Sequence, residues 1–298
     1  MFFTNSNRYI LGADIGGSHI TAAIIDSQEH QIISDTMVRV HVDPSAESVI
    51  ILSTWAEAIT MVLQNADDAK PGYLAFAMPG PFNYQDGISL IKGLHKYDLL
   101  YGVNVKEYLS EKLDLPLHKI GFINDAQAFL EGEIRVNGYS KSKKILGVTL
   151  GTGLGTAISY NGVTNDMNFA MLPFLNGIAE EYLSTRWFVN RYNQLCDQPV
   201  SNVKEMIMQG QHMITDTVFD EFTNNFSKFL SYVINKEGVE EVVIGGNIAK
   251  AEDKFLNALT YNLNKTGMLT QPCNLLIANL GELSAMIGAA LQLNDNSN

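Results

Sequence analysis

Cysteine is scarce in this chain of 298 residues, which contains only Cys196 and Cys273. The two stand far apart and outside any CxxC pair, so they cannot form a structural zinc site alone, and they suit a reducing cytoplasm. Basic residues are also few, because 20 Lys and Arg stand against 32 Asp and Glu and leave a net charge of −12. Nucleic acid and anionic membranes are therefore not expected as partners, since counterion-driven affinity needs a basic surface.

Long apolar runs and several catalytic motifs are missing as well. No run reaches the roughly 18 residues needed to span a bilayer, and residues 1–9 lack the basic and apolar regions of a signal peptide. The sequence contains no P-loop, no GxGxxG fingerprint, no HExxH and no GxSxG. These absences disfavour a P-loop ATPase, a dinucleotide-binding enzyme, a zinc hydrolase and an α/β-hydrolase, and we expect a cytoplasmic protein.

The composition fits a folded protein with two domains. Hydrophobic residues make up 46% of the chain and charged residues 17%, which is ordinary for a globular protein. A chain of 298 residues reaches the size at which a single hydrophobic core stops growing, so two domains with cores of their own are expected.

Residues 9–26, YILGADIGGSHITAAIID, predict a strand, a tight glycine turn and a second strand. Gly16 and Gly17 let a ligand approach the main-chain N–H groups. Ser18 adds a hydroxyl donor, and Asp14 offers a carboxylate to a metal ion or its water shell. The pattern indicates a cradle for phosphate, and an ordinary β-hairpin with an Asp at a strand end is the alternative.

A second copy of this pattern occupies residues 144–160, KILGVTLGTGLGTAISY. A gapless overlay of the two copies places Thr149 on Asp14 and Gly151 on Gly16, and the flanking hydrophobic residues match too. The chain is therefore expected to consist of two related halves. Each half offers a glycine turn to a shared cleft, where a polyphosphate would lie against Gly151, Thr152 and Gly153 of the second turn.

Two further sites for chemistry are predicted where buried strands end, because α/β folds place ligand sites at the carboxyl ends of strands. The strand at residues 73–77 runs into Met78-Pro79-Gly80-Pro81. The strand at residues 118–123 runs into Asn124 and Asp125, and a helix follows at residues 127–136. The alternatives are that Asp125 caps this helix and that Asn124 is a turn residue.

The spacing of apolar residues in the rest of the chain predicts further elements and a domain boundary. We expect a loop over residues 83–100, irregular structure over 161–177, a helix over 178–192, and a strand over 241–244 that leads into Gly245 and Gly246. The boundary is expected near Asn124, between a first domain of residues 1–123 and a second of residues 124–298. The final helix, residues 282–292, is a candidate to pack back on the first domain.

Six motifs in the same order resemble those of the ROK (repressor, open reading frame, kinase) family of sugar kinases. They are DIGGSHITAAIID, MPGP, INDAQAFLEGE, LGTGLGTA, VVIGGNI and LGELSAMIGAA. The resemblance covers nearly the whole chain. It implies a two-domain α/β fold of the actin-like or hexokinase-like ATPases, with duplicated, ribonuclease H-like mixed sheets and flanking helices around an interdomain cleft.

The resemblance also implies roles for individual residues. Asp125 matches the family's general base, which takes the proton of the sugar's primary hydroxyl as that oxygen attacks the γ-phosphate of ATP. Asn124 matches a residue that binds sugar hydroxyls, and Glu180 matches a Glu with the same task, with Glu181 as the alternative. Gly80 and Pro81 are also expected to contact the sugar, and Gly245 and Gly246 the adenosine. Asp14 is expected to bind Mg²⁺ through water. The nucleotide phosphates are expected to lie against Asp14, Gly16, Gly17, Ser18, Gly151, Thr152 and Gly153.

The chain departs from the family pattern in two places. Residues 164–184, TNDMNFAMLPFLNGIAEEYLS, lack the His and Cys residues with which many ROK proteins bind a structural zinc. Phe169 stands near the expected His, Ile178 stands where a Cys is expected, and Asp166 replaces a Glu, so no protein zinc site is expected. The segment GLHKYDLLYG stands where the family has a sugar-contacting Asn.

Two functions from different classes follow from the sequence. The first is an ATP- and Mg²⁺-dependent kinase of a hexose or amino sugar, with glucose as the first guess and N-acetylglucosamine or N-acetylmannosamine next. The second is a sugar sensor or regulator with the same fold. Repression of transcription is not expected. ROK repressors carry an N-terminal helix-turn-helix, but only about eight residues precede the first strand here, and the net charge is negative. The resemblance also implies a homodimer, because dimers are common in the family.

Overall fold

The structure is a computed structural model that describes residues 3–4, 7–93, 96–209, 211–265 and 267–296. The chain forms two compact units, unit 1 with residues 1–139 and 282–298, and unit 2 with residues 140–281. The division falls after Tyr139 and not after residue 123. The sequence therefore assigned the helix that begins at Asp125 to a different unit from the one in which it packs.

Unit 1 contains a mixed sheet with the strand order β3-β2-β1-β5-β8, and β4 also pairs with β2. The strands β1 and β2 form the expected antiparallel hairpin around the first glycine turn, whereas β5 and β8 run parallel to β1. The bounds are β1 Tyr9–Ile15, β2 His19–Asp26, β3 Gln31–Ile32, β4 Val38–His41, β5 Tyr73–Met78 and β8 Ile120–Asn124.

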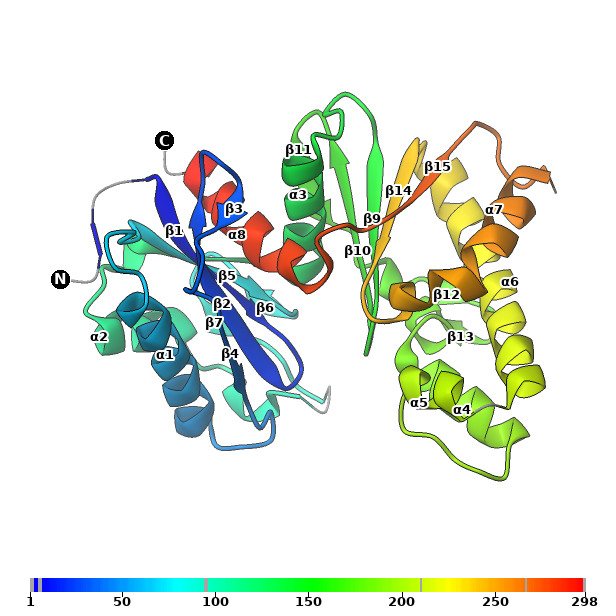
Figure 1. The fold of residues 1–298 in the computed structure, drawn as a ribbon, viewed down its shortest axis with the longest axis horizontal. Helices are drawn as coiled ribbons and strands as arrows, with labels where there is room; N and C mark the ends of the chain where they lie inside the picture. Colours follow the sequence, from blue (N-terminus) through cyan, green and yellow to red (C-terminus); the bar gives the residue numbers. More distant parts are fainter. Residues whose placement is uncertain (1–2, 5–6, 94–95, 210, 266, 297–298) are drawn as a thin grey trace. The chain divides into compact units, whose positions relative to one another are not determined.

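Helices cover both faces of this sheet (Figure 1). The helix α1 (Ser48–Gln64) buries apolar side chains at helical spacing, and they pack with Leu11 and Ala13 of β1 on one face. Residue Gly12 points to the other face, where an added Cβ would lie 2.6 Å from the main-chain oxygen of Met286. Helix α8 (Ser284–Asn296) can approach β1 this closely only because Gly12 has no side chain. The remaining helices are α2 (Val105–Leu113) and α3 (Asp125–Asn137).

The helices α3 and α8 pack against each other at two glycines, which is why α3 belongs to unit 1. A Cβ at Gly132 would lie 2.1 Å from the Ser284 carbonyl oxygen, and one at Gly288 would lie 1.8 Å from the Ala128 carbonyl oxygen. Glu133 is fully buried beside this crossing, where it accepts hydrogen bonds from the Ser284 hydroxyl at 2.6 Å and from the Asn137 amide at 2.9 Å. A buried carboxylate needs such donors to offset its lost hydration.

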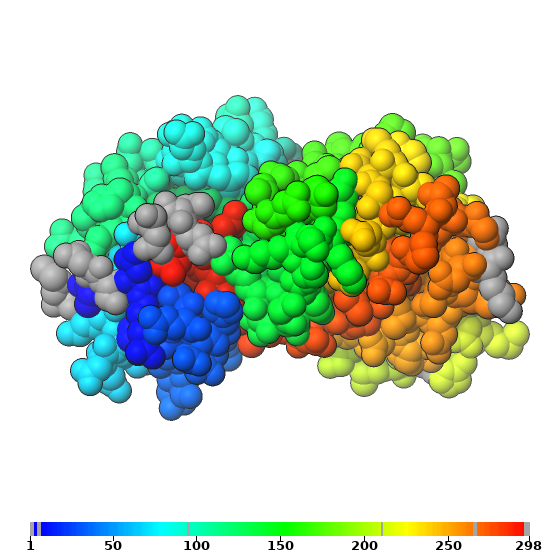
Figure 2. All heavy atoms as spheres, turned by 90° about the horizontal axis from the view of Figure 1, so that it is seen from above, coloured from blue at the N-terminus to red at the C-terminus, as the bar shows by residue number. Residues whose placement is uncertain are grey.

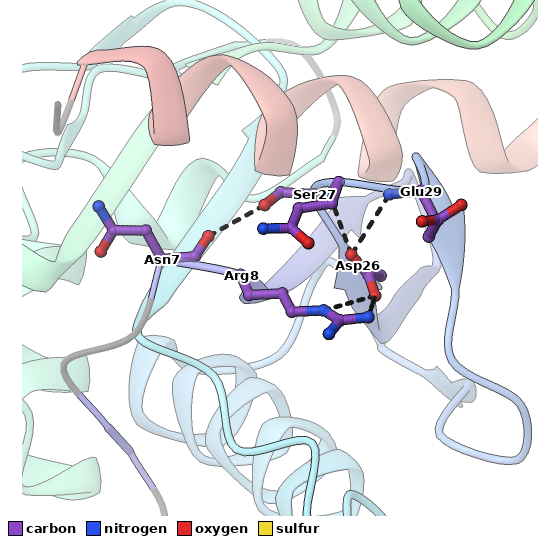
Figure 3. Close-up of polar contacts among 6 residues, drawn as sticks. Asn7, Arg8, Asp26, Ser27 and Glu29 are labelled. Atoms are coloured by element: carbon purple, nitrogen blue, oxygen red, sulfur yellow. Dashed lines mark hydrogen bonds and ion pairs between the residues drawn. The ribbon is translucent and has the colours of Figure 1, made fainter.

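The open end of the first hairpin is held by an ion pair (Figure 3). The Arg8 guanidinium donates to Oδ2 of Asp26 at 2.7 and 3.0 Å, and the amides of Gln28 and Glu29 donate to Oδ1. Burial acts to raise the pKa of Asp26, but the hydrogen bonds from Arg8 and from the two amides lower this pKa below its usual value. This contact fixes where β1 begins and β2 ends.

Unit 2 repeats the plan of unit 1 in its own sheet, which has the strand order β11-β10-β9-β14-β15. The strands β9 and β10 form the second glycine hairpin, and β14 and β15 run parallel to β9. The bounds are β9 Ile145–Leu150, β10 Leu154–Tyr160, β11 Val163–Asp166, β14 Glu241–Gly245 and β15 Asn274–Ile277.

The core of unit 2 is built on the long helix α6 (His212–Glu237), whose aromatic side chains meet those of α4 (Thr185–Leu195). The Phe188 and Phe222 rings lie 4.8 Å apart between centroids. Helix α7 (Leu256–Lys265), drawn in orange, lies on the surface of this unit in Figure 2 and packs on α6 through the buried side chains of Leu259 and Leu263. The short helix α5 (Val203–Met208) completes the set.

Three segments differ from their predicted structure. The expected loop over residues 83–100 contains part of a short hairpin, β6 (Phe82–Asn83) and β7 (Ile88–Ser89), and the 3₁₀ turn η1 (Asp98–Leu100). The expected irregular stretch 161–177 contains β11, the 3₁₀ turn η3 (Phe169–Met171) and β12 (Pro173–Phe174). The expected helix over residues 178–192 is wrong, because β13 (Gly177–Ile178) and the 3₁₀ turn η4 (Ala179–Glu181) precede α4.

None of the helices in the described part of the chain is long and apolar enough to cross a membrane.

Candidate active site

The first glycine turn connects β1 to β2 and is closed by main-chain hydrogen bonds. The Gly16 N–H donates to the His19 carbonyl oxygen at 2.9 Å, and the Gly16 carbonyl oxygen accepts from the Tyr97 hydroxyl at 2.7 Å. Gly17 is exposed, and nothing lies within 4 Å of the place where its Cβ would be. The Ser18 hydroxyl lies 2.9 Å from Nδ1 of His19. The turn therefore presents an open main chain, as a phosphate cradle requires.

Asp14 stands at the end of β1 with other charged groups nearby. The pKa of its carboxyl is raised to about 7, first by burial and then by the negative charges of Asp125 and Glu282, while the positive charge of Arg39 acts in the opposite direction. The side chain keeps partial contact with solvent, so a part of this effect is screened. The structure thus brings Asp14 and Asp125 close enough for their charges to interact, and this accumulation of negative charge favours binding of a cation.

A Mg²⁺ ion fits this donor set. Within the part of the chain that the structure describes, no group of three or more His, Cys, Asp or Glu side chains is arranged to hold a metal ion. Mg²⁺ is usually bound by one or two carboxylates together with water and substrate phosphates, and does not need a cage made of protein alone. Asp14, at the end of β1 beside the open glycine turn, would supply such a carboxylate.

Asn124 and Asp125 stand where β8 passes into α3. Oδ1 of Asn124 accepts hydrogen bonds from the Ala126 and Gln127 amides at 2.9 and 3.1 Å, so Asn124 is the N-cap of the helix. The alternative in which Asp125 caps the helix is wrong. Asp125 is instead the first helical residue, beside the partial positive charge of the helix N-terminus.

The Asp125 carboxylate is only partly engaged. Its side chain is half-buried, and Oδ1 accepts from the Ala126 amide at 2.9 Å. Among the residues that the structure describes, no hydrogen-bond donor to Oδ2 is found. One carboxylate oxygen is therefore available to accept a proton from a ligand, which is the geometry that a general base needs.

The Pro-Gly loop after β5 meets Asn124 through a tyrosine that the sequence did not single out. The Tyr84 hydroxyl donates to the Met78 carbonyl oxygen at 3.1 Å and accepts from the Asn124 amide at 3.2 Å. A Cβ on Gly80 would lie 3.3 Å from this hydroxyl. Tyr84 thus lies beside both Gly80 and Asn124 in unit 1, and Tyr84 and Asn124 help to line a pocket of about 160 Å³.

The second glycine turn, in unit 2, is closed in a similar way. The Gly151 N–H donates to the Gly153 carbonyl oxygen at 3.0 Å, and the Gly151 carbonyl oxygen accepts from the Thr185 N–H at 2.8 Å. Thr152 is exposed, and nothing lies within 4 Å of a Cβ built on Gly151. The bond from Thr185 also explains where α4 begins, since it anchors the first residue of that helix to the turn.

Glu180 is attached to this same turn. Its Oε2 accepts from the Leu154 amide at 3.1 Å, and its Oε1 accepts from Arg186 at 3.0 Å. A Cβ on Gly153 would lie 2.5 Å from Oε2, so Gly153 leaves room for the carboxylate. Glu181 instead accepts from the Ile178 amide at 3.1 Å and closes the short η4 turn. The geometry places Glu180, and not Glu181, beside the second glycine turn.

Gly245 and Gly246 stand at the end of β14, the strand next to β9. Gly246 has a φ of 88°, which favours glycine, and its Cβ would lie 2.4 Å from the carbonyl oxygen of Leu150. This glycine is therefore required by the packing of one main chain on another, directly before the second turn. Its place beside Leu150 brings the loop after β14 close to Gly151.

Three residues near these sites carry no sequence signal that would have found them. Tyr84 and Tyr97 lie in the segment predicted as a loop, and Arg186 lies in the segment predicted as one continuous helix. None of them belongs to a glycine turn or a strand end, the two patterns that indicate ligand sites in this sequence. Each is identified only by the atom it contacts: the Met78 carbonyl, the Gly16 carbonyl and the Glu180 carboxylate.

The curated relatives of this chain include N-acetyl-D-glucosamine kinases and polyphosphate glucokinases. The N-acetyl-D-glucosamine kinase of Histophilus somni (strain 129Pt) is 29% identical over 173 residues, which are 57% of this chain and 52% of that protein. The chain spans about half the length of the first curated relatives that it matches, this one and that of Mannheimia succiniciproducens.

Solved structures agree in fold. A ROK family glucokinase from Streptomyces griseus, solved with glucose and AMPPNP, has a TM-score of 0.75 and 20% identity, and the match covers 95% of this chain and 98% of that one. A ROK family transcriptional regulator, a homologue of the E. coli MLC protein, has a TM-score of 0.76 and 14% identity over 98% of this chain and 78% of that one. These likenesses confirm the expected two-domain α/β fold. Because the model of the ROK family matches residues 10–166, more than half of the sequence, the chain belongs to the ROK family.

Proposed function

We propose that this protein is a sugar kinase that transfers the γ-phosphoryl group of ATP to the primary hydroxyl of a hexose or amino sugar. The observation that carries the proposal is the Asp125 carboxylate. It stands on the first turn of α3 with one oxygen available, close enough to Asp14 to raise the pKa of that carboxyl. A half-buried carboxylate that uses only Oδ1 in a hydrogen bond to the Ala126 amide suits a general base better than a helix cap.

In the proposed reaction Asp125 takes the proton of the sugar hydroxyl. The hydroxyl oxygen forms a bond to the γ-phosphorus while the bond from that phosphorus to the bridging oxygen of ADP breaks. The products are a sugar phosphate and ADP, and the proton stays on Asp125 until solvent removes it. Bound Mg²⁺ supplies positive charge that neutralises the phosphates, and Asp14 would hold it through water.

The other site residues have supporting tasks in this proposal. Asn124 caps α3 through Oδ1 and donates one amide hydrogen to Tyr84, so its second amide hydrogen can bind a sugar hydroxyl. Gly80, Pro81 and Glu180 have the same task in the proposal. The two glycine turns, residues 16–18 and 151–153, offer main-chain and hydroxyl donors to the phosphates. Gly245 and Gly246 leave the adenosine a main-chain surface. Tyr84 joins the sugar-binding group, because its hydroxyl contacts Asn124 at 3.2 Å.

Glucose is the first sugar to test, and glucose 6-phosphate is the expected product. The glucokinase from Streptomyces griseus was solved with glucose and an ATP analogue, which supports both glucose and ATP. The relatives named as N-acetyl-D-glucosamine kinases support N-acetylglucosamine as the next candidate, followed by N-acetylmannosamine. The expected setting is the cytoplasm and the expected assembly is a homodimer, which size-exclusion chromatography would test.

The rival function is a sugar sensor or regulator that does not turn over ATP. The likeness to a ROK family transcriptional regulator supports it, because a shared fold does not decide between a kinase and a regulator. The available Asp125 oxygen and the open glycine turns favour the kinase, since a sensor would need neither a general base nor a cradle for phosphate.

A coupled assay of ADP release separates the two functions. It should be run with ATP and Mg²⁺ across glucose, mannose, fructose, N-acetylglucosamine and N-acetylmannosamine, with the protein without sugar as the control. The kinase predicts sugar-dependent ADP release at roughly 1–10³ per second, the range of typical enzymes, with one preferred sugar. Sugar binding by calorimetry without any ADP release would favour the sensor and contradict the kinase.

A further inference from the structure

Tyr97 contacts the first glycine turn from a distant part of the sequence. Its side chain is fully buried, and its hydroxyl donates to the Gly16 carbonyl oxygen at 2.7 Å. The residue is fixed at both ends, because its own N–H donates to the Pro44 carbonyl oxygen at 2.9 Å and its ring packs edge-on against that of Trp55, with centroids 5.5 Å apart. The φ of 56° is unusual for a residue with a side chain, so the surrounding structure holds Tyr97 in a costly conformation.

The hydrogen bond from the Tyr97 hydroxyl to the Gly16 carbonyl oxygen determines where the Gly17 N–H points. The peptide unit between Gly16 and Gly17 is planar, and in a trans peptide the carbonyl and the N–H point in opposite directions. With the Gly16 carbonyl held by Tyr97, the Gly17 N–H must point away from the buried phenol. It points toward the exposed side of the turn, where nothing lies within 4 Å of a Cβ on Gly17. A peptide between two glycines would otherwise flip at little cost.

In the second glycine turn the corresponding carbonyl oxygen, that of Gly151, also accepts a hydrogen bond, but from a different kind of donor. Gly151 overlays on Gly16 when the two hairpin sequences are aligned without a gap. Its carbonyl oxygen accepts from the Thr185 N–H at 2.8 Å, and the donor again comes from outside the hairpin. By the same planarity, the Thr152 N–H points away from α4. Two unrelated donors on the corresponding carbonyl indicate that the orientation of this peptide matters to both turns.

We propose that Tyr97 is a positioning residue for the nucleotide phosphates, which fixes the Gly17 N–H in the direction of a phosphate oxygen before ATP binds. The inference rests on the proposed function, because it assigns a phosphate to this turn. Two tyrosines from the segment predicted as a loop thereby assist the binding of both substrates. Tyr84 contacts Asn124, which is proposed to bind the sugar, and Tyr97 contacts the first glycine turn.

The phenol of Tyr97 keeps its proton between about pH 6 and pH 9. Burial and the charge of Asp14 raise the pKa of Tyr97 well above its usual value. The hydroxyl is therefore a permanent donor, and the effect of removing it should not depend on pH between about 6 and 9.

The test is Tyr97→Phe, which removes the hydroxyl and keeps the buried ring. Tyr101→Phe is the matched control, because Tyr101 lies four residues further on and its side chain is 54% exposed. The Gly16 carbonyl is left without its donor and the peptide is free to flip, so Mg·ADP should bind roughly five- to thirty-fold more weakly by calorimetry. The KM for ATP should rise by a similar factor, while kcat and glucose affinity change by less than about twofold. A crystal structure of the variant should show the Gly16–Gly17 peptide rotated.

Each outcome decides the proposal. Unchanged Mg·ADP affinity in folded Tyr97→Phe protein would overturn it. Equal losses of nucleotide affinity, glucose affinity and melting temperature would show that Tyr97 only supports the fold, which also overturns it. Failure of the proposed function is seen separately, in the parent protein: if the parent binds Mg·ADP without phosphorylating any sugar, the kinase is excluded while the comparison of Mg·ADP affinities still tests Tyr97. A parent that binds no nucleotide would overturn both.

Discussion

Unit 1 and unit 2 build their sheets in the same order, with an antiparallel hairpin around a glycine turn followed by two parallel strands. They differ in the charge that gathers at the strand ends. In unit 1 the first strand ends near Asp14, which interacts with Asp125 and Glu282. In unit 2 the residue that overlays on Asp14 is Thr149, a neutral hydroxyl. Under the proposed function, the duplicated sheet provides two similar phosphate turns, and only one of them carries the carboxylates for metal binding and proton transfer.

The loops that follow β5 and β14 differ in a similar way. Both begin at the carboxyl end of a parallel strand that lies next to the hairpin strand. In unit 1 this loop holds Gly80 beside the side chain of Tyr84, whereas in unit 2 Gly246 packs on the main chain of Leu150. The same place in the sheet thus serves side-chain recognition in one unit and main-chain packing in the other.

Asp125→Asn tests the charge asymmetry directly and has the largest expected effect. If Asp125 is the base, kcat should fall by about 10²- to 10⁴-fold, because the amide cannot accept the hydroxyl proton. Glucose affinity should stay within several-fold, and the melting temperature should change little, since the N-cap is Asn124 and not Asp125.

The matched control is Glu107→Gln, which neutralises an exposed carboxylate in the first turn of α2. Both changes remove one negative charge near a helix N-terminus, so both should cost a few tenths of a kcal/mol of stability. Only Asp125→Asn should affect turnover. An Asp125→Asn protein that works within several-fold of the parent rate would remove Asp125 from the mechanism and restore the sensor as the leading function.

Much of unit 1 was predictable because its signals are local. The β1–β2 hairpin, the strand before Met78 and the β8–α3 junction each follow from a run of apolar residues that ends in glycine, proline or asparagine. The boundary was misplaced because the contact of α3 with α8 joins residues about 150 positions apart, as the Glu133–Ser284 hydrogen bond shows. Nothing in the local pattern around residue 124 reports such a contact.

The predicted helix over residues 178–192 failed for a related reason. Its apolar spacing is helical, but the Thr185 N–H is bound by the Gly151 carbonyl and the Ile178 N–H by the Glu181 carboxylate. A continuous helix would use the Thr185 N–H for its own hydrogen bond four residues back, whereas the Ile178 N–H is one of the first four that such a helix leaves without an acceptor. The bond from Thr185 to Gly151 is therefore the tertiary contact that overrides the local preference. Tyr84 and Tyr97 were not foreseen at all, because a buried tyrosine in a loop shows its task only through the carbonyl to which it donates.

One added methyl group in each of the two loops should have different costs in stability. Gly246→Ala should destabilise the protein by on the order of 3 kcal/mol, because its Cβ would lie 2.4 Å from a main-chain oxygen and its φ is positive. Gly80→Ala should cost less than about 1 kcal/mol, since its Cβ would meet only the Tyr84 hydroxyl at 3.3 Å. Urea unfolding of both variants measures the difference. Equal costs would mean that the two loops pack alike.

Two alanine substitutions within the second turn should separate the substrates. Gly153→Ala places a Cβ 2.5 Å from Oε2 of Glu180, which must move and lose its bond to the Leu154 amide. We expect the KM for sugar to rise about tenfold, or 1.4 kcal/mol, with little loss of stability. Gly151→Ala adds a methyl group where nothing lies within 4 Å in the protein, so it should raise the KM for ATP instead. Identical kinetics in the two variants would argue against separate tasks for the two glycines.

Asp14→Asn is expected to change the stability of the protein without ligands, and only in part of the pH range. The folded-state pKa of Asp14 is raised to about 7 from 3.8. Below pH 4 the carboxyl is neutral in both states and affects stability little. Between pH 4 and 7 the unfolded chain releases this proton while the folded chain retains it, so the parent loses stability as the pH rises. Above pH 7 the carboxyl is ionised in both states, and the loss is complete.

Asn cannot ionise, so Asp14→Asn should melt near the parent temperature at pH 4 and above it at pH 8. Because solvent reaches part of the Asp14 side chain, we expect a gain on the order of 1–2 kcal/mol at pH 8, less than the full pKa shift would give. Adding Mg²⁺ with ADP should stabilise the parent more than the variant, because only the parent offers a carboxylate to the ion. Thr149→Val in unit 2 should show neither effect. A parent and an Asp14→Asn variant with the same pH profile would mean that the charge does not gather at this strand end, and the contrast between the two units would lose its electrostatic basis.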